Sequence, residues 1–212
     1  MLHTETIEHG TLELLRSLQA VPILSAFNLV GGTALALRIG HRKSIDLDLF
    51  TQEEFDLEEL KSFLVGKYGM KVSFARGQTL KGFIDDVMID CIRLDYPHLQ
   101  NPDIFDGVRL ESLPDIVAMK LSALTQNGSR IKDFIDIATL STVYSFNEML
   151  GFYVSKFPNV NVIMPLKSIT YFDDIDFGEP IVMTSSDFHW DSIAGRLVEM
   201  VSNPDKVFET MP

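Results

Sequence analysis

The sequence is poor in cysteine and in long apolar segments. Cys91 is the only cysteine among 212 residues, so the chain cannot form an internal disulfide, and no Cys/His spacing typical of zinc sites is present. No run approaches the ~18 consecutive apolar residues that a membrane span requires. Residues 1–6 lack the basic start of a secretory signal. These absences predict a cytoplasmic protein with no membrane association.

Positive charge is the second deficit. Lys and Arg total 18 against 30 Asp and Glu, which gives a formal net charge of −12. Phosphate neutralisation dominates nucleic-acid affinity, so this balance argues against a dedicated DNA- or RNA-binding surface, although nucleic acid stays open as a reaction partner. The cations that lie near glycine and aspartate motifs would guide a triphosphate or an RNA end into an otherwise acidic protein; they are Arg38, His41, Arg42, Lys43, Lys120, Arg130 and Lys132.

The remaining composition is that of an ordinary globular chain, with 46% hydrophobic and 23% charged residues. The apolar periodicity and turn signals predict an α+β fold. It would consist of a mixed β-sheet core flanked by helices over residues 1–112 and a mainly helical C-terminal part over residues 113–212. Predicted helices are 11–19, 33–39, 57–68, 114–126, 132–144, 147–157 and 188–201, with shorter elements over 161–170. Predicted strands are 27–30, 47–50, 70–76, 80–85, 87–94 and 107–110.

Gly31 and Gly32 stand between the first predicted strand and the helix over residues 33–39. Without a β-carbon, glycine lets the backbone turn sharply and lets a phosphate approach it closely. The helix after the pair would present unpaired N–H groups and the positive end of its dipole to that phosphate. A Gly-Gly pair before a helix is more often only a tight turn, so the motif gains weight from the acidic strand that comes after it.

Two aspartates alternate with leucines about a dozen residues later. Successive side chains of a strand point to opposite faces, so Asp46 and Asp48 would share one face while Leu47 and Leu49 anchor the other. Their Cα atoms would lie roughly 7 Å apart, close enough for both carboxylates to ligate shared or adjacent metal ions. Oxygen ligands suit Mg²⁺, with Mn²⁺ as a substitute, and Mg²⁺ also takes substrate phosphates as ligands.

A third carboxylate comes from a predicted hairpin. Asp85 and Asp86 form a plausible two-residue turn between the strands over 80–85 and 87–94. Asp90 then lies in mid-strand among aliphatic neighbours, where a lone charge is costly unless it is paired or bound to metal. We therefore interpret Asp90 as a third metal ligand. Cys91, its neighbour, should point away from the site into the core.

These residues resemble the nucleotidyltransferase superfamily that includes DNA polymerase beta. More narrowly, segments 31–37 and 40–50 resemble the AbiEii toxin family of type IV toxin–antitoxin or abortive-infection systems. Segment 113–124 is similar to the family's lysine-bearing helix, and segment 130–136 is similar to its later acidic motif. Segment 171–174 also fits the usual tail. The resemblance implies a nucleotidyltransferase-like core, a nucleoside triphosphate substrate, an RNA acceptor such as tRNA and a cognate antitoxin as partner.

The resemblance also assigns roles by position. Asp46 and Asp48 would ligate metal with Asp90, and Lys120 would contact the nucleotide phosphates. Asp133 would be the late catalytic acidic residue, a role that Asp136 could share. Without the resemblance, Lys120 is interpreted as a solvated helix residue and the two aspartates as an exposed acidic stripe. Nucleotide contacts are expected from Gly31, Gly32, Thr33, Arg42, Ser44 and Lys120; Arg42 could equally be an ordinary loop cation, and Ser44 could simply bridge loop and strand.

Together the motifs predict a magnesium-dependent nucleotidyltransferase that attacks the α-phosphorus of a nucleoside triphosphate with two metal ions and releases pyrophosphate. Lys120 and Asp133 would close over a nucleotide held by the sheet core. Two alternatives share part of this pattern. A non-catalytic interaction protein on the same fold should have lost a metal carboxylate, and none is missing. A small-molecule nucleotidyltransferase of the antibiotic-modifying type would need an acidic acceptor pocket, which the −12 charge permits.

Overall fold

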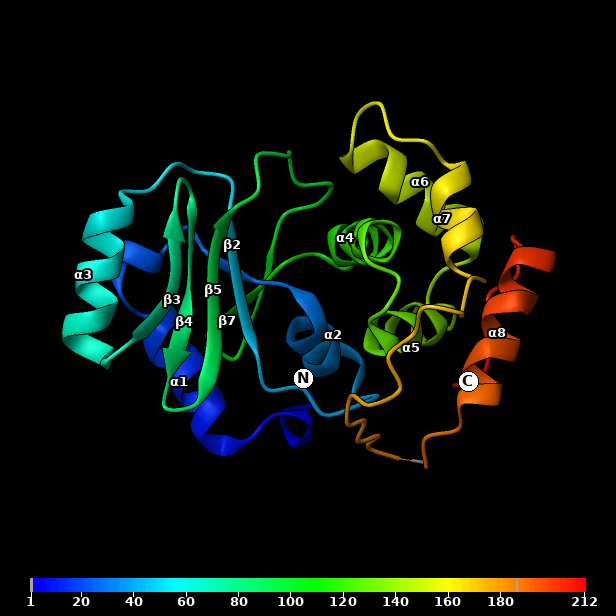
Figure 1. The fold of residues 1–212 in the computed structure, drawn as a ribbon, viewed down its shortest axis with the longest axis horizontal. Helices are drawn as coiled ribbons and strands as arrows, with labels where there is room; N and C mark the ends of the chain where they lie inside the picture. Colours follow the sequence, from blue (N-terminus) through cyan, green and yellow to red (C-terminus); the bar gives the residue numbers. More distant parts are fainter. Residues whose placement is uncertain (1, 186) are drawn as a thin grey trace. The chain divides into compact units, whose positions relative to one another are not determined.

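A computed structural model describes residues 2–185 and 187–212 and divides the chain into two compact units. We call them the sheet unit, Met1–Pro97 with Asn101–Glu111, and the helical unit, His98–Gln100 with Ser112–Pro212. Figure 1 shows a twisted sheet in the first unit and packed helices in the second. Among the described residues, no helix is both long and apolar enough to cross a lipid bilayer.

The sheet unit is built on a seven-stranded mixed sheet in the order β3-β4-β5-β2-β1-β7-β6. Its strands are β1 (Asn28–Leu29), β2 (Leu47–Thr51), β3 (Lys71–Arg76), β4 (Thr79–Ile84), β5 (Val87–Arg93), β6 (Asp103–Phe105) and β7 (Val108–Leu110). β2 pairs in parallel with β5, and β1 in parallel with β7; the other neighbours are antiparallel. The mixed α+β fold predicted from the sequence is confirmed.

Three helices flank this sheet. They are α1 (His9–Gln19), α2 (Gly31–Ile39) and α3 (Leu57–Tyr68), with short 3-10 helices at Thr4–Thr6 and Pro22–Leu24. α3 packs on β3 and β4, α1 on β7 and α2 on β2, and Figure 1 shows α3 and α2 on opposite sides of the sheet. One sheet face is apolar and buried, because Leu47, Leu49, Leu80, Ile89 and Cys91 are all fully inaccessible.

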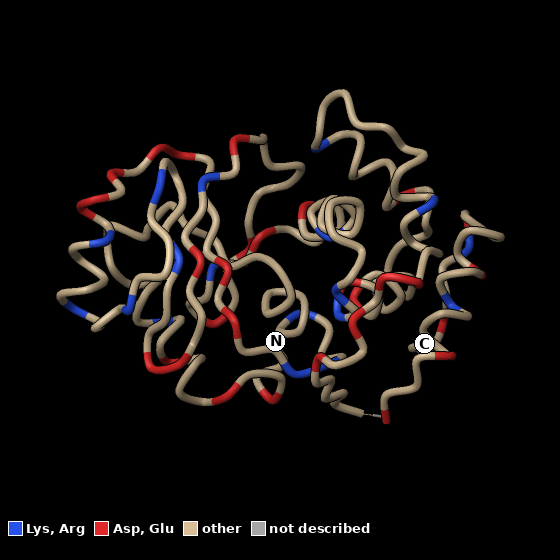
Figure 2. Tube along the Cα trace, viewed as in Figure 1, with Lys and Arg blue, Asp and Glu red and all other residues tan. Residues whose placement is uncertain are grey.

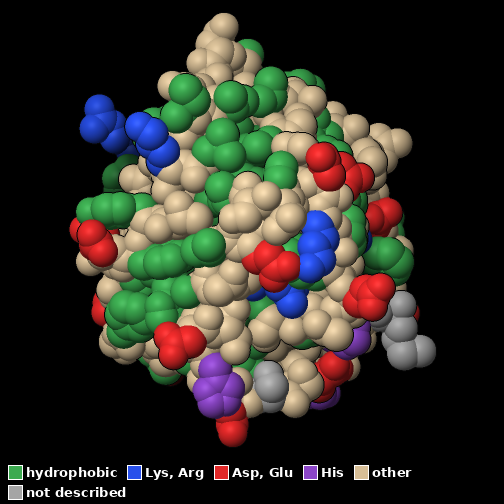
Figure 3. All heavy atoms as spheres, turned by 90° about the vertical axis from the view of Figure 1, so that its right-hand side faces the viewer, with side chains coloured by type: hydrophobic (Ala, Val, Ile, Leu, Met, Phe, Trp, Pro, Cys, Tyr) green, Lys and Arg blue, Asp and Glu red, His purple; other side chains and the backbone are tan. Residues whose placement is uncertain are grey.

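The helical unit contains α4 (Leu113–Gln126), α5 (Ile131–Leu140), α6 (Phe146–Lys156), α7 (Ile163–Ser168) and α8 (Trp190–Ser202). α4 packs against α5, α6 and α7, and α5 packs against α8. Trp190 meets the rings of Phe134, Phe172 and Phe177 edge to face at centroid separations of 6.1, 5.3 and 5.3 Å. Figure 3 shows hydrophobic side chains gathered over much of one face of the molecule, with charged groups between them.

The predicted element boundaries need four corrections. The strand over 27–30 is reduced to Asn28–Leu29, and the helix over 132–144 ends at Leu140. The glycine pair does not precede the helix but forms its first two residues. The hairpin partner β6 was missed, although Asp106 and Gly107, with φ of 51° and 80°, form the kind of turn that an Asp-Gly pair favours.

Candidate active site

Asp48 and Asp90 lie side by side on the central strands. β2 and β5 are parallel neighbours whose register pairs Asp48 with Asp90 directly, so both carboxylates stand on the sheet face opposite Leu49 and Cys91. Asp46 lies one residue before β2, in the loop that leads into the strand, whereas Asp48 belongs to the strand itself. Both residues are half-buried. The structure therefore pairs Asp48 with Asp90 and places Asp46 two residues before Asp48, while the ligation of one metal ion by all three carboxylates stays a prediction. In Figure 2 acidic positions cluster along these two strands.

Asp90 is the most buried of the three carboxylates, with 6% of its surface exposed. Its Oδ2 pairs with Nζ of Lys81, the residue directly opposite on β4. Its Oδ1 is inaccessible and has no hydrogen-bond partner within the described part of the chain. A buried carboxylate oxygen without a donor is unfavourable, which makes this atom available to a cation. Cys91 faces the core as predicted. Burial, and to a smaller extent the negative charge of Asp90, raise the pKa of its thiol to about 12.

Gly31 and Gly32 bring the start of α2 against these groups. Gly31 has φ of +70°, and a β-carbon there would overlap Oδ2 of Asp48. A β-carbon at Gly32 would overlap the guanidinium of Arg42 in the same way. Val30, the N-cap residue of α2, makes no side-chain cap hydrogen bond, and the first N–H groups and the positive dipole end of α2 lie at these glycines. Only glycine leaves room for the carboxylate and the guanidinium to approach the helix start.

The loop between α2 and β2 carries the remaining predicted nucleotide contacts in the sheet unit. Thr33 is buried; its Oγ1 lies 2.8 Å from Oγ of Ser44 and donates to the carbonyl of Asp46. Ser44 therefore links the loop to α2, and its contact with a nucleotide stays a prediction. Arg42 is only 2% exposed and its Nη1 donates to the carbonyl of Lys43 at 3.0 Å. Arg42 is therefore a buried cation of this loop, and its contact with nucleotide phosphates stays a prediction.

Lys120, Asp133 and Asp136 form a buried ion cluster in the helical unit. Nζ of Lys120 lies 2.7 Å from Oδ1 of Asp133 and 2.6 Å from Oδ2 of Asp136. The lysine is 5% exposed and both aspartates are fully inaccessible. The interpretations of Lys120 as a solvated residue and of the aspartates as an exposed stripe are thus excluded. Oδ2 of Asp133 accepts no hydrogen bond from any described residue, and Nε of Arg130 lies 3.7 Å from it.

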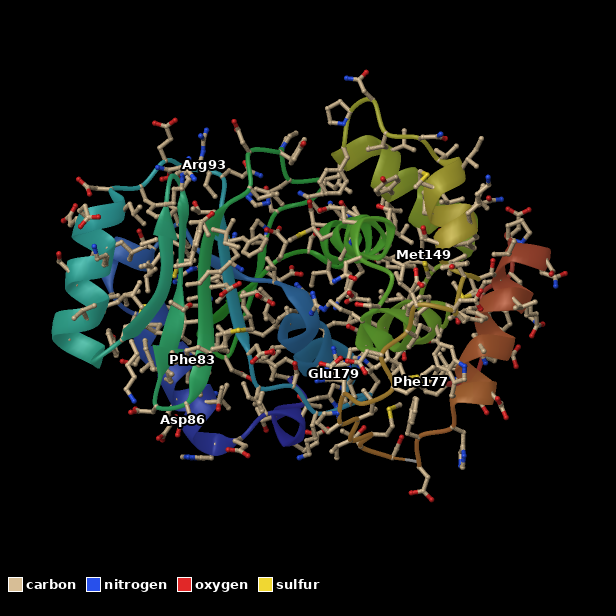
Figure 4. All side chains as sticks on the ribbon, in the orientation of Figure 1. Phe83, Asp86, Arg93, Met149, Phe177 and Glu179 are labelled. Carbon is tan, nitrogen blue, oxygen red and sulfur yellow. The ribbon has the colours of Figure 1, made fainter. Side chains whose placement is uncertain are left out.

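Sequence reasoning missed Lys81. A two-residue turn at Asp85 and Asp86, both with positive φ, sets the hairpin register, and that register places Lys81 opposite Asp90. The predicted turn contained the information needed to find Lys81, because pairing residues outward from the turn sets Lys81 opposite Asp90. Figure 4 labels Asp86 at this turn and Arg93 toward the other end of β5.

The sequence profile described as "Nucleotidyl transferase AbiEii toxin, Type IV TA system" matches residues 13–208 of this chain. The chain belongs to the AbiEii family. It is therefore a nucleotidyltransferase of a toxin family. An uncharacterized protein of Aquifex aeolicus (strain VF5) is 32% identical to this AbiEii protein over 171 residues, which cover 76% of the chain and 81% of that relative.

Two solved structures share the AbiEii chain's fold at low identity. JHP933 from Helicobacter pylori has a TM-score of 0.56 at 15% identity and covers 94% of this chain and 93% of its own. MenT4, a nucleotidyltransferase toxin from Mycobacterium tuberculosis H37Rv, has a TM-score of 0.57 at 14% identity, with coverage of 91% and 82%. The predicted resemblance to the AbiEii family and to the nucleotidyltransferase fold is confirmed.

Proposed function

We propose that this AbiEii protein transfers a nucleoside monophosphate from a magnesium-bound nucleoside triphosphate to an RNA acceptor, with tRNA favoured, and acts as the toxin of a pair with a cognate antitoxin. The observation that carries the proposal is the direct pairing of Asp48 with Asp90 beside the glycines of α2. This pairing supports a cation site beside a phosphate site. The RNA acceptor and the antitoxin are carried over from the family.

The residues of the sheet unit fit a divalent metal. Asp46, Asp48 and Asp90 offer hard carboxylate oxygens, and Oδ1 of Asp90 is buried without a hydrogen-bond donor among the described residues. These three side chains would hold the ion. Bound Mg²⁺ or Mn²⁺ supplies charge stabilisation to the triphosphate and to the attacking oxygen.

The reaction forms one bond to the α-phosphorus and breaks another. An acceptor hydroxyl oxygen attacks the α-phosphorus, the bond from that phosphorus to the bridging oxygen breaks, and pyrophosphate leaves while the hydroxyl proton passes to solvent. The N–H groups at the start of α2 would bind phosphate oxygens, because a helix N-terminus favours anions and the N-cap residue Val30 makes no side-chain cap hydrogen bond. Arg42 would hold the same phosphates through its guanidinium. Both groups orient the triphosphate for attack from one side.

Two residues of the helical unit have proposed roles in the reaction. Lys120 would contact the phosphates and neutralise the charge that develops on them. Asp133 would be the late catalytic carboxylate, because one of its oxygens lacks a hydrogen bond from the described residues, whereas Asp136 would hold Lys120 in place. The two parts of the chain, divided near residue 112, would thus both contribute residues to the reaction.

A label-transfer assay tests the proposal. The protein is incubated with each α-labelled nucleoside triphosphate, Mg²⁺ and total RNA, beside Asp48→Asn and Asp86→Asn variants. Asp86→Asn is a matched control, since this exposed turn residue has φ of 66°, a conformation that asparagine adopts readily. We expect label in RNA for the wild type and the control, and a loss of at least about 100-fold for Asp48→Asn. Equal transfer by all three proteins would contradict the metal-site assignment.

A further inference from the structure

The sheet face that carries the carboxylates continues outward over two more strands. Asp48 pairs with Asp90, Asp90 with Lys81, and Lys81 with Phe74, so these four residues form one row across β2, β5, β4 and β3. Directly opposed residues of neighbouring strands stand on the same face. A row that begins at the candidate metal site therefore ends at an aromatic side chain on the edge strand.

Phe83 lies on the same face in the adjacent row, where it pairs with Lys71 of β3. Its exposed fraction is 42% and that of Phe74 is 47%, although phenylalanine is usually buried. On the opposite face, Leu80 and Ile84 of the same strand β4 are buried. Figure 4 shows Phe83 toward the end of β4 that bears the Asp86 turn. This outer face of the sheet thus carries two exposed aromatic rings that are not part of the hydrophobic core.

A β-bulge aims Phe74 at this face. The register of β3 shifts between Val72 and Phe74. Without the extra residue, continued pairing from Lys71 and Phe83 would set Phe74 opposite Leu80, on the buried face. The bulge instead sets it opposite Lys81, and bulges beside active sites commonly redirect a side chain in this manner. The bulge therefore sets the face on which Phe74 lies, and the edge position of β3 leaves the ring exposed.

Three cations accompany the two rings. Lys71 and Arg76 are exposed and share the face through their partners Phe83 and Thr79, and the side chain of Lys81 is 40% exposed. We define Lys71, Phe74, Arg76, Lys81 and Phe83 as the outer platform. It contains no acidic residue, in a chain whose acidic residues outnumber its basic ones by 30 to 18. Because Lys81 is paired with Asp90, Lys71 and Arg76 supply the net positive charge, which is complementary to a polyanion.

We propose that the outer platform binds the single-stranded 3′ end of the acceptor RNA and delivers its terminal hydroxyl to the carboxylates. Exposed sheet aromatics that stack bases, flanked by cations that contact phosphates, are the usual means of holding single strands. Two strand spacings separate β3 from β5, about 10 Å. A strand whose end reaches Asp90 therefore crosses Lys81 and Phe74. This inference rests on the proposed function for the position of the acceptor, but its binding step can be measured separately.

The first test measures RNA affinity by fluorescence anisotropy with a labelled single-stranded RNA of about 10 nucleotides. We expect Phe74→Ala and Phe83→Ala to weaken binding about tenfold each, because each removes one stacked base. Phe105→Ala is the matched control, since Phe105 is 37% exposed on β6 at the opposite edge of the same sheet. The control should bind like the wild type. Unchanged affinity in both platform variants, or no RNA binding by the wild type, would overturn the proposal.

The second test uses salt dependence and does not rely on the aromatic variants. Removing Lys71 and Arg76 as K71Q and R76Q should lower the slope of log affinity against log salt by roughly 0.7 for each cation. An unchanged slope would overturn the proposal, because the phosphates would then lie elsewhere and the surface would suit a protein partner instead.

Label transfer separates this inference from the proposed function. If wild-type protein labels RNA and the double variant F74A/F83A has the same KM for RNA, the platform is wrong and the proposed function stands. If RNA affinity depends on Phe74 and Phe83 while no nucleotide is transferred, the platform stands and the proposed function fails. Asp48→Asn should keep RNA binding, because Asp48 is not part of the outer platform.

Discussion

At the residue scale, the proposed role of each group in the candidate site depends on the residues that it contacts. Asp90 lies in mid-strand, where one carboxylate oxygen pairs with Lys81 and the other is buried without a donor among the described residues. Gly31 is needed because the carboxylate of Asp48 fills the space of its β-carbon. The candidate site therefore depends on how closely these groups approach one another as much as on which residue types are present.

Asp133 and Asp136 allow a prediction at this scale. Asp133→Asn should lower nucleotide transfer by at least about 100-fold, and it should also cost about 1–3 kcal/mol of unfolding free energy, because its contact with Lys120 is buried at both ends. Asp136→Asn should cost about 1–3 kcal/mol of unfolding free energy, since both ends of its contact with Lys120 are buried. Transfer assays and urea denaturation measure the two effects. A stable, inactive Asp136→Asn beside an active Asp133→Asn would reverse the assignment.

At the element scale, helix ends are specified locally and were predicted well. Asp56 accepts from the backbone N–H groups of Glu58 and Glu59, and α3 ends at Gly69 in the left-handed conformation, as its sequence predicted. Pro114 stands in the first turn of α4, as predicted. The end of α5 was predicted too late, because the apolar pattern continues past Leu140 although the helix stops there. The spacing of apolar residues indicates which residues are buried. Because buried residues also occur in turns, this spacing does not mark where a helix ends.

Asp115, in the first turn of α4, ties three segments of the helical unit together. This fully buried carboxylate accepts from the N–H of Leu99 at 3.0 Å, from Ser112 and from Nζ of Lys156 at 2.6 Å. Burial alone would raise its pKa, but the hydrogen bonds from Lys156, Ser112 and Leu99 outweigh burial and hold the pKa below its ordinary value of 3.8. The ionised form is therefore bound more favourably in the folded protein.

A pH dependence arises from this shift. Because the folded-state pKa is depressed, the stabilisation by Asp115 is complete above the unfolded value of 3.8 and is lost as pH falls through the lower folded value. Asp115→Asn should cost about 3–5 kcal/mol at neutral pH, because Lys156 stays buried without its acid. The difference from wild type, measured by urea denaturation, should shrink only below pH 3.8. A difference that narrows already between neutral pH and mild acid would contradict this account.

At the scale of the whole molecule, the predicted site residues fall in two compact units of the chain. The carboxylates and glycines belong to the sheet unit, and the Lys120 cluster belongs to the helical unit. Trp190 is the chain's one tryptophan and lies in the helical unit, among phenylalanine rings. Its fluorescence therefore reports on the helical unit alone, whereas far-ultraviolet circular dichroism reports on both.

This division predicts how a metal ion affects unfolding. Mn²⁺ at about ten times its dissociation constant should stabilise the sheet unit by about 1.4 kcal/mol. The circular dichroism midpoint should rise, while the Trp190 fluorescence midpoint should move less. Asp48→Asn should abolish the rise, and Asp86→Asn should keep it. Equal shifts of both signals in the wild type would mean that the two units unfold as one.

The sequence by itself determined the local part of this protein. Alternating polarity identified β2, the adjacent aspartates Asp85 and Asp86 marked the β4–β5 hairpin, and the spacing of glycines and aspartates pointed to the AbiEii family. These signals lie within a few residues of one another, so neighbouring side chains and turn geometry are enough to identify them. The nucleotide-contact role of Lys120 was suggested only by resemblance.

Tertiary structure decided what depends on distant partners. It paired Asp48 with Asp90 across parallel strands that are far apart in the sequence, buried Arg42 against Gly32, and surrounded Lys120 with two aspartates. It also redirected Phe74 through a bulge, which reversed the face that simple alternation would assign to it. Parallel pairing and burial arise from long-range packing, and no local pattern encodes the partner strand or its register.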